Sequence, residues 1–178
     1  AEPIGGKRIY GNSHLQRSLI QNLDLRWEWY PRSGEAISVA GFYKHFQRPI
    51  ERVLVQTSDG NAPDVTFQNA RSANNYGVEL ELRKRLDGIG LSPFTVFTNT
   101  TLMRSRINVD TTDGSSLTRR DRPMVGQAGY VVNAGLEFLS RGGLSVTALD
   151  NVVGRRVFEA GIQPLPDAYE EARHLIDL

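Results

Sequence analysis

Hydrophobic and polar residues alternate along three segments of the chain, and this alternation is the clearest structural signal in the sequence. The segments are 22–30 (NLDLRWEWY), 76–83 (YGVELELR) and 130–138 (YVVNAGLEF). A strand sorts alternate residues onto two faces, whereas a helix would scatter them around its circumference. The pattern therefore predicts strands with one apolar and one polar face. A helix over 77–86, which is rich in helix-forming residues, remains the alternative for that segment.

Weaker alternation marks further strands between and after these three. They cover 36–46, 94–107 and 144–151, and a last one starts near Arg173. No segment has a convincing helical period, and 167–174 shows only a short helical tendency. We therefore expect an all-β chain, an antiparallel up-and-down meander of about seven strands.

The connections between these strands alternate between short and long. Turns rich in Pro and Gly occupy 31–35, 87–90 and 140–143, whereas long polar connections occupy 47–75, 108–125 and 152–172. A soluble Greek-key sandwich has no reason to alternate in this way. An outer-membrane barrel does, because it has tight periplasmic turns and long outer loops.

Aromatic residues fall at both ends of the predicted strands, as in the two interfacial girdles of a membrane barrel. At the periplasmic ends they are Trp27, Trp29, Tyr30, Phe94 and Phe138; at the outer ends they are Tyr43, Phe46, Tyr76 and Tyr130. The alternative is the general preference of aromatic residues for strands.

Composition excludes several classes of protein. The 178 residues carry a net charge of +1, with basic residues scattered along the chain, so nothing indicates a nucleic-acid partner. There is no Cys, which excludes disulfides and thiolate metal sites. No apolar run is long enough for a membrane-spanning helix, and the first residues do not resemble a signal peptide.

Four segments, in order, resemble the C-terminal barrel portion of TonB-dependent outer-membrane receptors. They are NLDLRWEWYPRSGEAISVAGFYKHFQRPIE (22–51), NARSANNYGVELELRKRL (69–86), YVVNAGLEF (130–138) and NVVGRRVFEAGIQPLPDAYEEARHLIDL (151–178). The resemblance implies a barrel of twenty-two antiparallel strands around an N-terminal plug domain. It also implies active uptake of ferric siderophores, cobalamin or glycans across a Gram-negative-type outer membrane, driven by an inner-membrane energy-transducing complex.

On this interpretation residues 1–178 are a partial, C-terminal barrel segment without the plug domain and the final strands. Such a segment leaves two strand edges open, so we expect an isolated copy to self-associate through them. The alternative function is a soluble secreted or periplasmic β-sheet module for binding or adhesion.

Charged residues on the polar face of the predicted strands are candidates for contact with a plug in the lumen, because buried charge needs water or a partner. These candidate lumen-facing residues are Asp24, Arg26, Glu28, Glu79, Glu81 and Arg83. Arginines in the predicted outer loops are candidates for contact with lipopolysaccharide or an anionic ligand. These candidate outer-loop residues are Arg119, Arg120, Arg122, Arg155 and Arg156. For both sets the alternative is ordinary solvated charge.

Nothing in the sequence points to catalysis or to a cofactor. His14, His45 and His174 lie far apart, and no nucleophile, base and orienting residue form a recognisable set, so an outer-membrane hydrolase has little support. Two acidic turns, around 59–64 and 110–114, contain only part of a calcium-loop pattern and are more typical of ordinary turns. We therefore expect no enzyme, no cofactor and no bound metal.

Overall fold

Seven strands form one antiparallel sheet, here called the wall sheet, in the computed structural model, which describes residues 8–55, 63–109 and 121–178. Its strands, in spatial order, are β1 (Leu19–Trp29), β2 (Ala36–Gln47), β5 (Ser72–Arg85), β6 (Phe94–Asn108), β7 (Tyr130–Leu139), β8 (Ser145–Val153) and β11 (Arg173–Asp177). Every pair of neighbours is antiparallel, which confirms the predicted meander. The helical alternative over 77–86 is wrong, because most of that segment belongs to β5.

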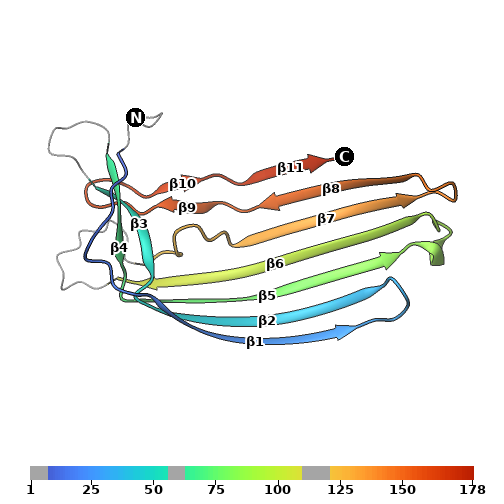
Figure 1. Cartoon of the computed structure of the whole chain (residues 1–178), viewed down its shortest axis with the longest axis horizontal. Coiled ribbons are helices and arrows are strands. Elements are labelled where there is room, and N and C mark those ends of the chain that lie inside the picture. The colour runs from blue at the N-terminus through green and yellow to red at the C-terminus, as the bar shows by residue number, and fades with distance from the viewer. Residues whose placement is uncertain (1–7, 56–62, 110–120) are drawn as a thin grey trace.

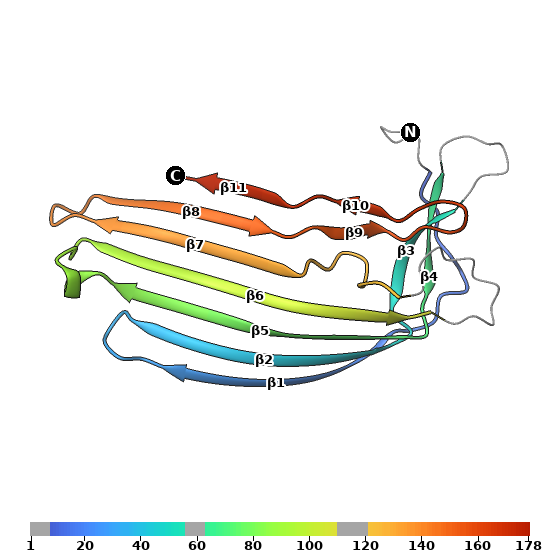
Figure 2. The ribbon, with the colours of Figure 1, turned by 180° about the vertical axis from the view of Figure 1, so that it is seen from behind.

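Short and long connections alternate between the two ends of the wall sheet, as predicted. The short turns 30–35, 86–93 and 140–144 share one end, which we call the turn end (Figure 1). The turn after β5 contains the one helical element of the described residues, the 3₁₀ helix η1 (Asp87–Ile89). The connections 48–71, 109–129 and 154–172 share the opposite end, the loop end (Figure 2).

Two of the long connections contain strands where the sequence pattern predicts loop. β3 (Ile50–Val55) pairs with β4 (Asp64–Asn69), and β9 (Arg156–Glu159) pairs with β10 (Ala168–Glu170). These four strands, here called the cap, lie at the loop end, where β3 and β4 run crosswise to the wall strands (Figures 1 and 2). β3 and β4 lack alternation because each buries consecutive residues, and therefore both faces, while β9 and β10 are only four and three residues long. The predictions for 47–75 and 152–172 are corrected accordingly.

The two faces of the wall sheet have different chemistry. Cross-strand register places Leu25, Gly41, Val78 and Leu102 in one row on the apolar face. A row on the polar face runs from β1 to β8 through Glu28, Ser38, Glu81, Asn99, Asn133 and Asn151. Large side chains of the apolar face stay exposed, so they do not converge into a dry interior. This arrangement removes the main support for a soluble globular module.

The buried core lies at the loop end, and not against a face of the wall sheet. Val53, Val65, Val157 and Ala160 of the cap region are almost fully buried. Main-chain hydrogen bonds from Leu54 N to the Ala160 carbonyl (2.8 Å) and back from Ala160 N to the Arg52 carbonyl join the two cap hairpins. The cap is therefore a small protein core at one end of an uncovered sheet.

Most of the predicted aromatic placements agree with the register. The rings of Phe94 and Phe138 lie 5.1 Å apart at the turn end. Tyr43 and Tyr76 are cross-strand partners nearer the loop end. Phe46 is an exception, because it belongs to the opposite face and packs against Ala73 and its buried neighbours. The prediction that Phe46 joins an interfacial girdle is therefore wrong.

Candidate functional site

The six predicted lumen-facing residues all lie on the polar face of the wall sheet. Asp24, Arg26 and Glu28 project from β1, and Glu79, Glu81 and Arg83 project from β5, with β2 between them. Because the facing residues of β2 are small, Ser38 and Ala40, Arg26 reaches across that strand. Its Nη2 lies 2.9 Å from Oε2 of Glu81, and its Nε binds Glu28. Small residues on the middle strand thus connect charges two strands apart.

A second ion pair on the polar face crosses β6 in the same way. Arg83 Nη2 on β5 lies 2.8 Å from Glu137 Oε2 on β7, and its guanidinium lies 5.7 Å from the ring centre of Phe97 on β6. Glu137 is not one of the six predicted residues, although its position in the alternation of 130–138 also puts it on the polar face. Within the described part of the chain, Asp24 and Glu79 form no ion pair, so only four of the six predicted residues are paired.

These pairs are partly exposed, with 29–48% of each side chain accessible. Exposed ion pairs contribute only about 0–1 kcal/mol each to stability. Next to them, Asn151 Nδ2 donates a 2.6 Å hydrogen bond to Asn133 Oδ1. The polar face is therefore a hydrated surface of charges and amides suited to contact with another polar surface. It contains no arrangement for covalent chemistry.

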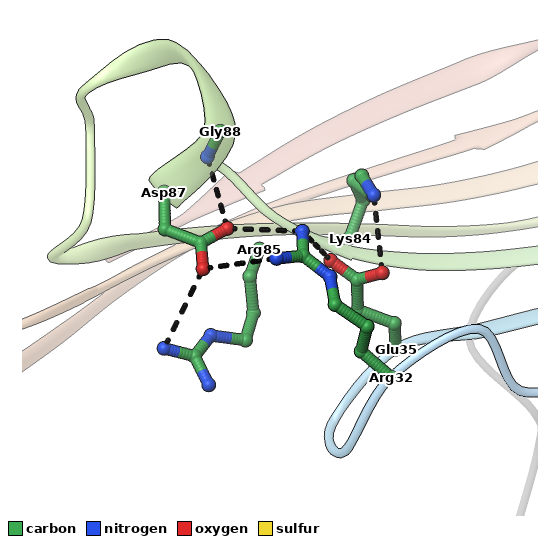
Figure 3. Close-up of polar contacts among 6 residues, drawn as sticks. All are labelled: Arg32, Glu35, Lys84, Arg85, Asp87 and Gly88. Atoms are coloured by element: carbon green, nitrogen blue, oxygen red, sulfur yellow. Dashed lines mark hydrogen bonds and ion pairs between the residues drawn. The ribbon is translucent and has the colours of Figure 1, made fainter.

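A second polar cluster joins two turns at the turn end (Figure 3). Glu35, whose side chain is inaccessible, accepts hydrogen bonds from Arg32 Nη2 at 2.9 Å and from Lys84 Nζ at 3.0 Å. Arg32 also donates to Asp87 in the turn after β5. Gly34 lies between these residues at φ +79°, a conformation that favours glycine. The cluster ties the β1–β2 turn to the β5–β6 turn.

Both carboxylates of this cluster stay ionised to lower pH than usual. Burial opposes ionisation of Glu35, but the hydrogen bonds from Lys84 and Arg32 outweigh it and hold the pKa of Glu35 below its ordinary value. Burial also opposes ionisation of Asp87. The charges of Arg32 and Arg85, together with the Gly88 N–H, outweigh that penalty and hold the pKa of Asp87 low. The cluster is therefore charged on both sides at neutral pH.

At the loop end a buried ion pair organises the chain next to the cap. Arg122 Nη2 and Nη1 lie 2.6 Å and 3.1 Å from the two carboxylate oxygens of Glu51, and Val125 N donates to the same carboxylate at 3.0 Å. The Arg122 side chain is inaccessible to solvent. The expectation that Arg122 contacts a ligand or lipopolysaccharide is wrong, because its guanidinium is buried and paired with Glu51 inside the protein. Removing one partner of such a pair costs about 3–5 kcal/mol, because the other charge stays buried.

The other predicted outer-loop arginines have different surroundings. Arg119 and Arg120 lie outside the described residues. Arg155 stacks 4.0 Å from the ring centre of Tyr169 and pairs with Glu171 at 3.1 Å, and Arg156 pairs with Glu170 at 2.6 Å. Arg155 and Arg156 help to line a cavity of about 490 Å³, together with Arg104 and Arg106 of β6. The structure thus gathers cationic side chains from β6 and the cap around one opening.

No group of three or more His, Asp or Glu residues capable of holding a metal ion occurs among the described residues. Of the acidic-turn residues, Asp64 accepts a hydrogen bond from Arg8 N at 3.2 Å, while Asp59, Asp110 and Asp113 lie outside the described residues. In the parts of the chain that the structure covers, none of the helical structure is long and apolar enough to cross a membrane.

Comparisons with known proteins agree with this architecture. A family model described as TonB dependent receptor-like, beta-barrel, matches residues 2–168. A comparison with curated proteins found no match. Among solved structures, a ferric enterobactin receptor from Pseudomonas aeruginosa is similar, with a TM-score of 0.59 and 17% identity over 94% of this chain. The FrpB iron transporter from Neisseria meningitidis is similar with a TM-score of 0.58 and 14% identity over 96% of this chain. The chain spans 24% of the length of each of these two proteins.

Proposed function

Because the chain belongs to the TonB-dependent receptor β-barrel family, we propose that it forms part of the wall and the outer loops of a receptor for active uptake of a scarce nutrient. Proteins of this family are outer-membrane transporters and are not enzymes. The loop end then corresponds to the outside of the cell and the turn end to the periplasm. In this role the chain carries out no covalent chemistry.

The two-faced wall sheet is the observation that carries this proposal. One face exposes leucines, valines, tryptophans and tyrosines on six of the seven wall strands, from β1 to β8, while the other exposes charges and amides. A membrane barrel needs this division because its outer surface contacts acyl chains and its inner surface contacts water or a plug. A soluble protein would have to cover the apolar face, and the described residues include no second layer over it.

We further propose that the polar face contacts a plug domain in the intact receptor. Arg26, Glu81, Arg83 and Glu137 form ion pairs whose exposed sides can accept hydrogen bonds or donate them to a partner. Asp24 and Glu79 have no ion pair among the described residues and offer their charge to such a partner. Uptake in this family would require the plug and an inner-membrane energy-transducing complex.

For the ligand, we propose an anionic ferric siderophore in preference to cobalamin or a glycan. Support comes from Arg155 and Arg156 at the loop end, which help to line a cavity of about 490 Å³. The similar solved proteins are named as a ferric enterobactin receptor and an iron transporter. At this level of identity, the structural similarity is evidence for the fold alone. Arg155 and Arg156 are the residues proposed to attract the ligand, because 55% and 32% of their side chains are exposed.

Uptake by the full-length receptor tests this function directly. Cells that depend on the receptor should accumulate a labelled ferric siderophore, and not cobalamin or oligosaccharides. Replacing Arg155 and Arg156 with Ala should reduce uptake at low ligand concentration, whereas Arg141→Ala in a short turn at the other end should leave it unchanged. Uptake of another nutrient class, or equal uptake by both variants, would refute the ligand assignment.

We also propose that an isolated copy of this chain self-associates. The strands β1 and β11 are the two edges of the wall sheet, and unpaired edge groups attract other strands. Light scattering in detergent-free buffer should detect oligomers, and a monodisperse monomer would contradict the proposal.

A further inference from the structure

Two polar side chains lie side by side on the apolar face of the wall sheet, near the edge that β11 forms (Figure 1). His174 Nε2 on β11 lies 2.6 Å from Asp150 Oδ1 on β8, and 59% and 43% of these side chains are exposed. We propose that the apolar face around this pair, over β6, β7, β8 and β11, binds a second copy of the receptor within the membrane. The inference requires an outer-membrane location and is independent of which nutrient is transported.

The register places the pair between two aromatic rows of the apolar face. On β7, Tyr130 marks the outer row and Phe138 the row at the turn end, and Ala134 lies midway between them. Asp150 is the cross-strand partner of Ala134, and His174 lies one row further outward. Rows are two residues, or about 7 Å, apart along a strand. The pair therefore lies near the middle of an apolar band that is about 25 Å tall in membrane barrels.

A polar pair is costly at this depth if lipid is its neighbour. Acyl chains offer no hydrogen bonds, and ionisable residues inside a membrane are rare and mark functional contacts. Among the described residues, Asp150 Oδ2 and His174 Nδ1 have no hydrogen-bond partner, and no second layer of this chain covers them. A neighbouring protein can supply the polar contacts that lipid cannot.

The side chains around the pair are smaller than those elsewhere in the same rows. On β6, β7, β8 and β11 the two rows contain, besides the pair, Thr98, Ala134 and Ile176 in one and Thr100, Val132 and Val152 in the other. On β1, β2 and β5 the same two rows contain Trp29, Ile37 and Leu82 in one and Trp27, Val39 and Leu80 in the other. Small residues and hydroxyl groups allow close approach between protein surfaces in a membrane. One half of the apolar face thus suits protein contact, and the other half suits lipid.

Charge complementarity assigns a second copy as the occupant. An acid beside a base is complementary to itself, because a two-fold axis along the membrane normal brings the carboxylate of each copy to the imidazole of the other. The same rotation keeps both copies in one orientation across the membrane. Thr98 and Thr100, whose hydroxyl groups lie 3.5 Å apart, can exchange hydrogen bonds across this axis. A different partner would need its own acid and base at this depth.

Cross-linking between copies of the full-length receptor in native membranes tests the assignment. Ala134→Cys and Ile37→Cys, each in a receptor without other cysteines, place a thiol in the same row inside and outside the proposed contact. A short bifunctional maleimide should join Ala134→Cys copies into dimers and leave Ile37→Cys copies largely monomeric. Adding Asp150→Asn should lower the dimer fraction about threefold, as expected for one polar contact in a membrane. Adding Ala148→Leu, one row from Asp150 on the same face, should lower it by blocking close approach while the ion pair remains.

A charge exchange separates contact between copies from a local structural role. Asp150→His combined with His174→Asp keeps one acid and one base in each copy, so the dimer fraction should recover. Retention of the folded form in cold electrophoresis shows that each variant barrel is intact. The proposal is overturned by equal cross-linking of the two cysteine variants or by an unchanged dimer fraction in both Asp150→Asn and Ala148→Leu. It is also overturned if the exchange restores nothing in a folded barrel, or if Ala134→Cys is joined only to another membrane protein. Nutrient uptake by the same cells shows separately whether the transport function fails.

Discussion

Leu25 in the wall sheet and Leu54 in the cap are both strand leucines, yet 79% of Leu25 is exposed and only 5% of Leu54. The wall leaves its apolar side chains on an open face, and the cap packs its apolar side chains against a second hairpin. The difference shows that the cap can form its core from this chain alone. The wall depends on a second phase, which we identify as the hydrocarbon of the membrane.

The ion pairs of the cap region and of the wall differ in the same way, one being buried and the others exposed. Glu51 of the cap is buried together with Arg122 of the neighbouring connection, whereas the pairs Arg26–Glu81 and Arg83–Glu137 of the wall lie on its polar face in contact with water. A buried pair is costly to break because the remaining charge has no solvent. A solvated pair costs little to break, because water stabilises the charge that remains. Four predictions test this comparison, in order of decreasing effect.

Shortening the two leucines should give the largest contrast. Leu54→Ala should destabilise the cap by about 2–5 kcal/mol, because a cavity forms in a packed core. Leu25→Ala should cost less than about 1 kcal/mol in the membrane, where lipid chains fill the space. Hydrogen exchange of the Leu54 amide, which donates to Ala160, and chemical unfolding of the reconstituted receptor measure the two effects. Equal losses for both variants would mean that the apolar face of the wall is covered by protein.

Adding a cation to adjacent residues of β5 should distinguish the two faces. Leu80→Arg on the apolar face should cost about 2–4 kcal/mol if the residue lies near the middle of the membrane. Glu79→Arg on the polar face places the same side chain in water and should have little effect on folding. Unfolding of both variants in lipid vesicles provides the measurement. The two-faced interpretation fails if Glu79→Arg is the more damaging change.

Acid should weaken the cluster that joins the turns. Because the pKa of Glu35 is lowered on folding, its contribution is complete above the unfolded value, near 4.5, and is lost as the pH falls through the lower folded value. Glu35→Gln should therefore reduce the melting temperature at neutral pH, and the difference from the parent protein should shrink in acid. Glu171→Gln, at an exposed ion pair of the opposite end, serves as the control. A difference independent of pH would contradict the role of ionised Glu35.

The smallest effect on folding should come from the polar face. Replacing Glu79 and Arg83 with Gln removes one exposed ion pair, worth about 0.2–1 kcal/mol. In the intact receptor the same double change should nevertheless release the plug at a lower denaturant concentration, if this face contacts it. Plug accessibility to a soluble protease follows the release, with Arg141→Gln as the control. An unchanged release midpoint would count against plug contact.

Local pattern was enough to predict the wall. The alternation of 22–30, 76–83 and 130–138 determined which residues share a face, because side-chain direction in a strand depends only on sequence parity. The six charged residues of the polar face were identified in this way. The same rule also included Glu137, but its pairing with Arg83 depends on cross-strand register, which parity does not specify.

The strands of the cap and the buried ion pair beside it depended on contacts between distant segments. β3 and β4 lack alternation because protein covers both of their faces, and β9 and β10 are too short to show a period, so these strands became visible only with their partners. The sequence predicts Arg122 to be an outer-loop cation; only the structure places Glu51, seventy-one residues away, beside it. The sequence alone determined the strands and their two faces, since these follow from local geometry; only the tertiary structure decided which charges are buried and where a surface is left hollow, since these depend on neighbours from other strands.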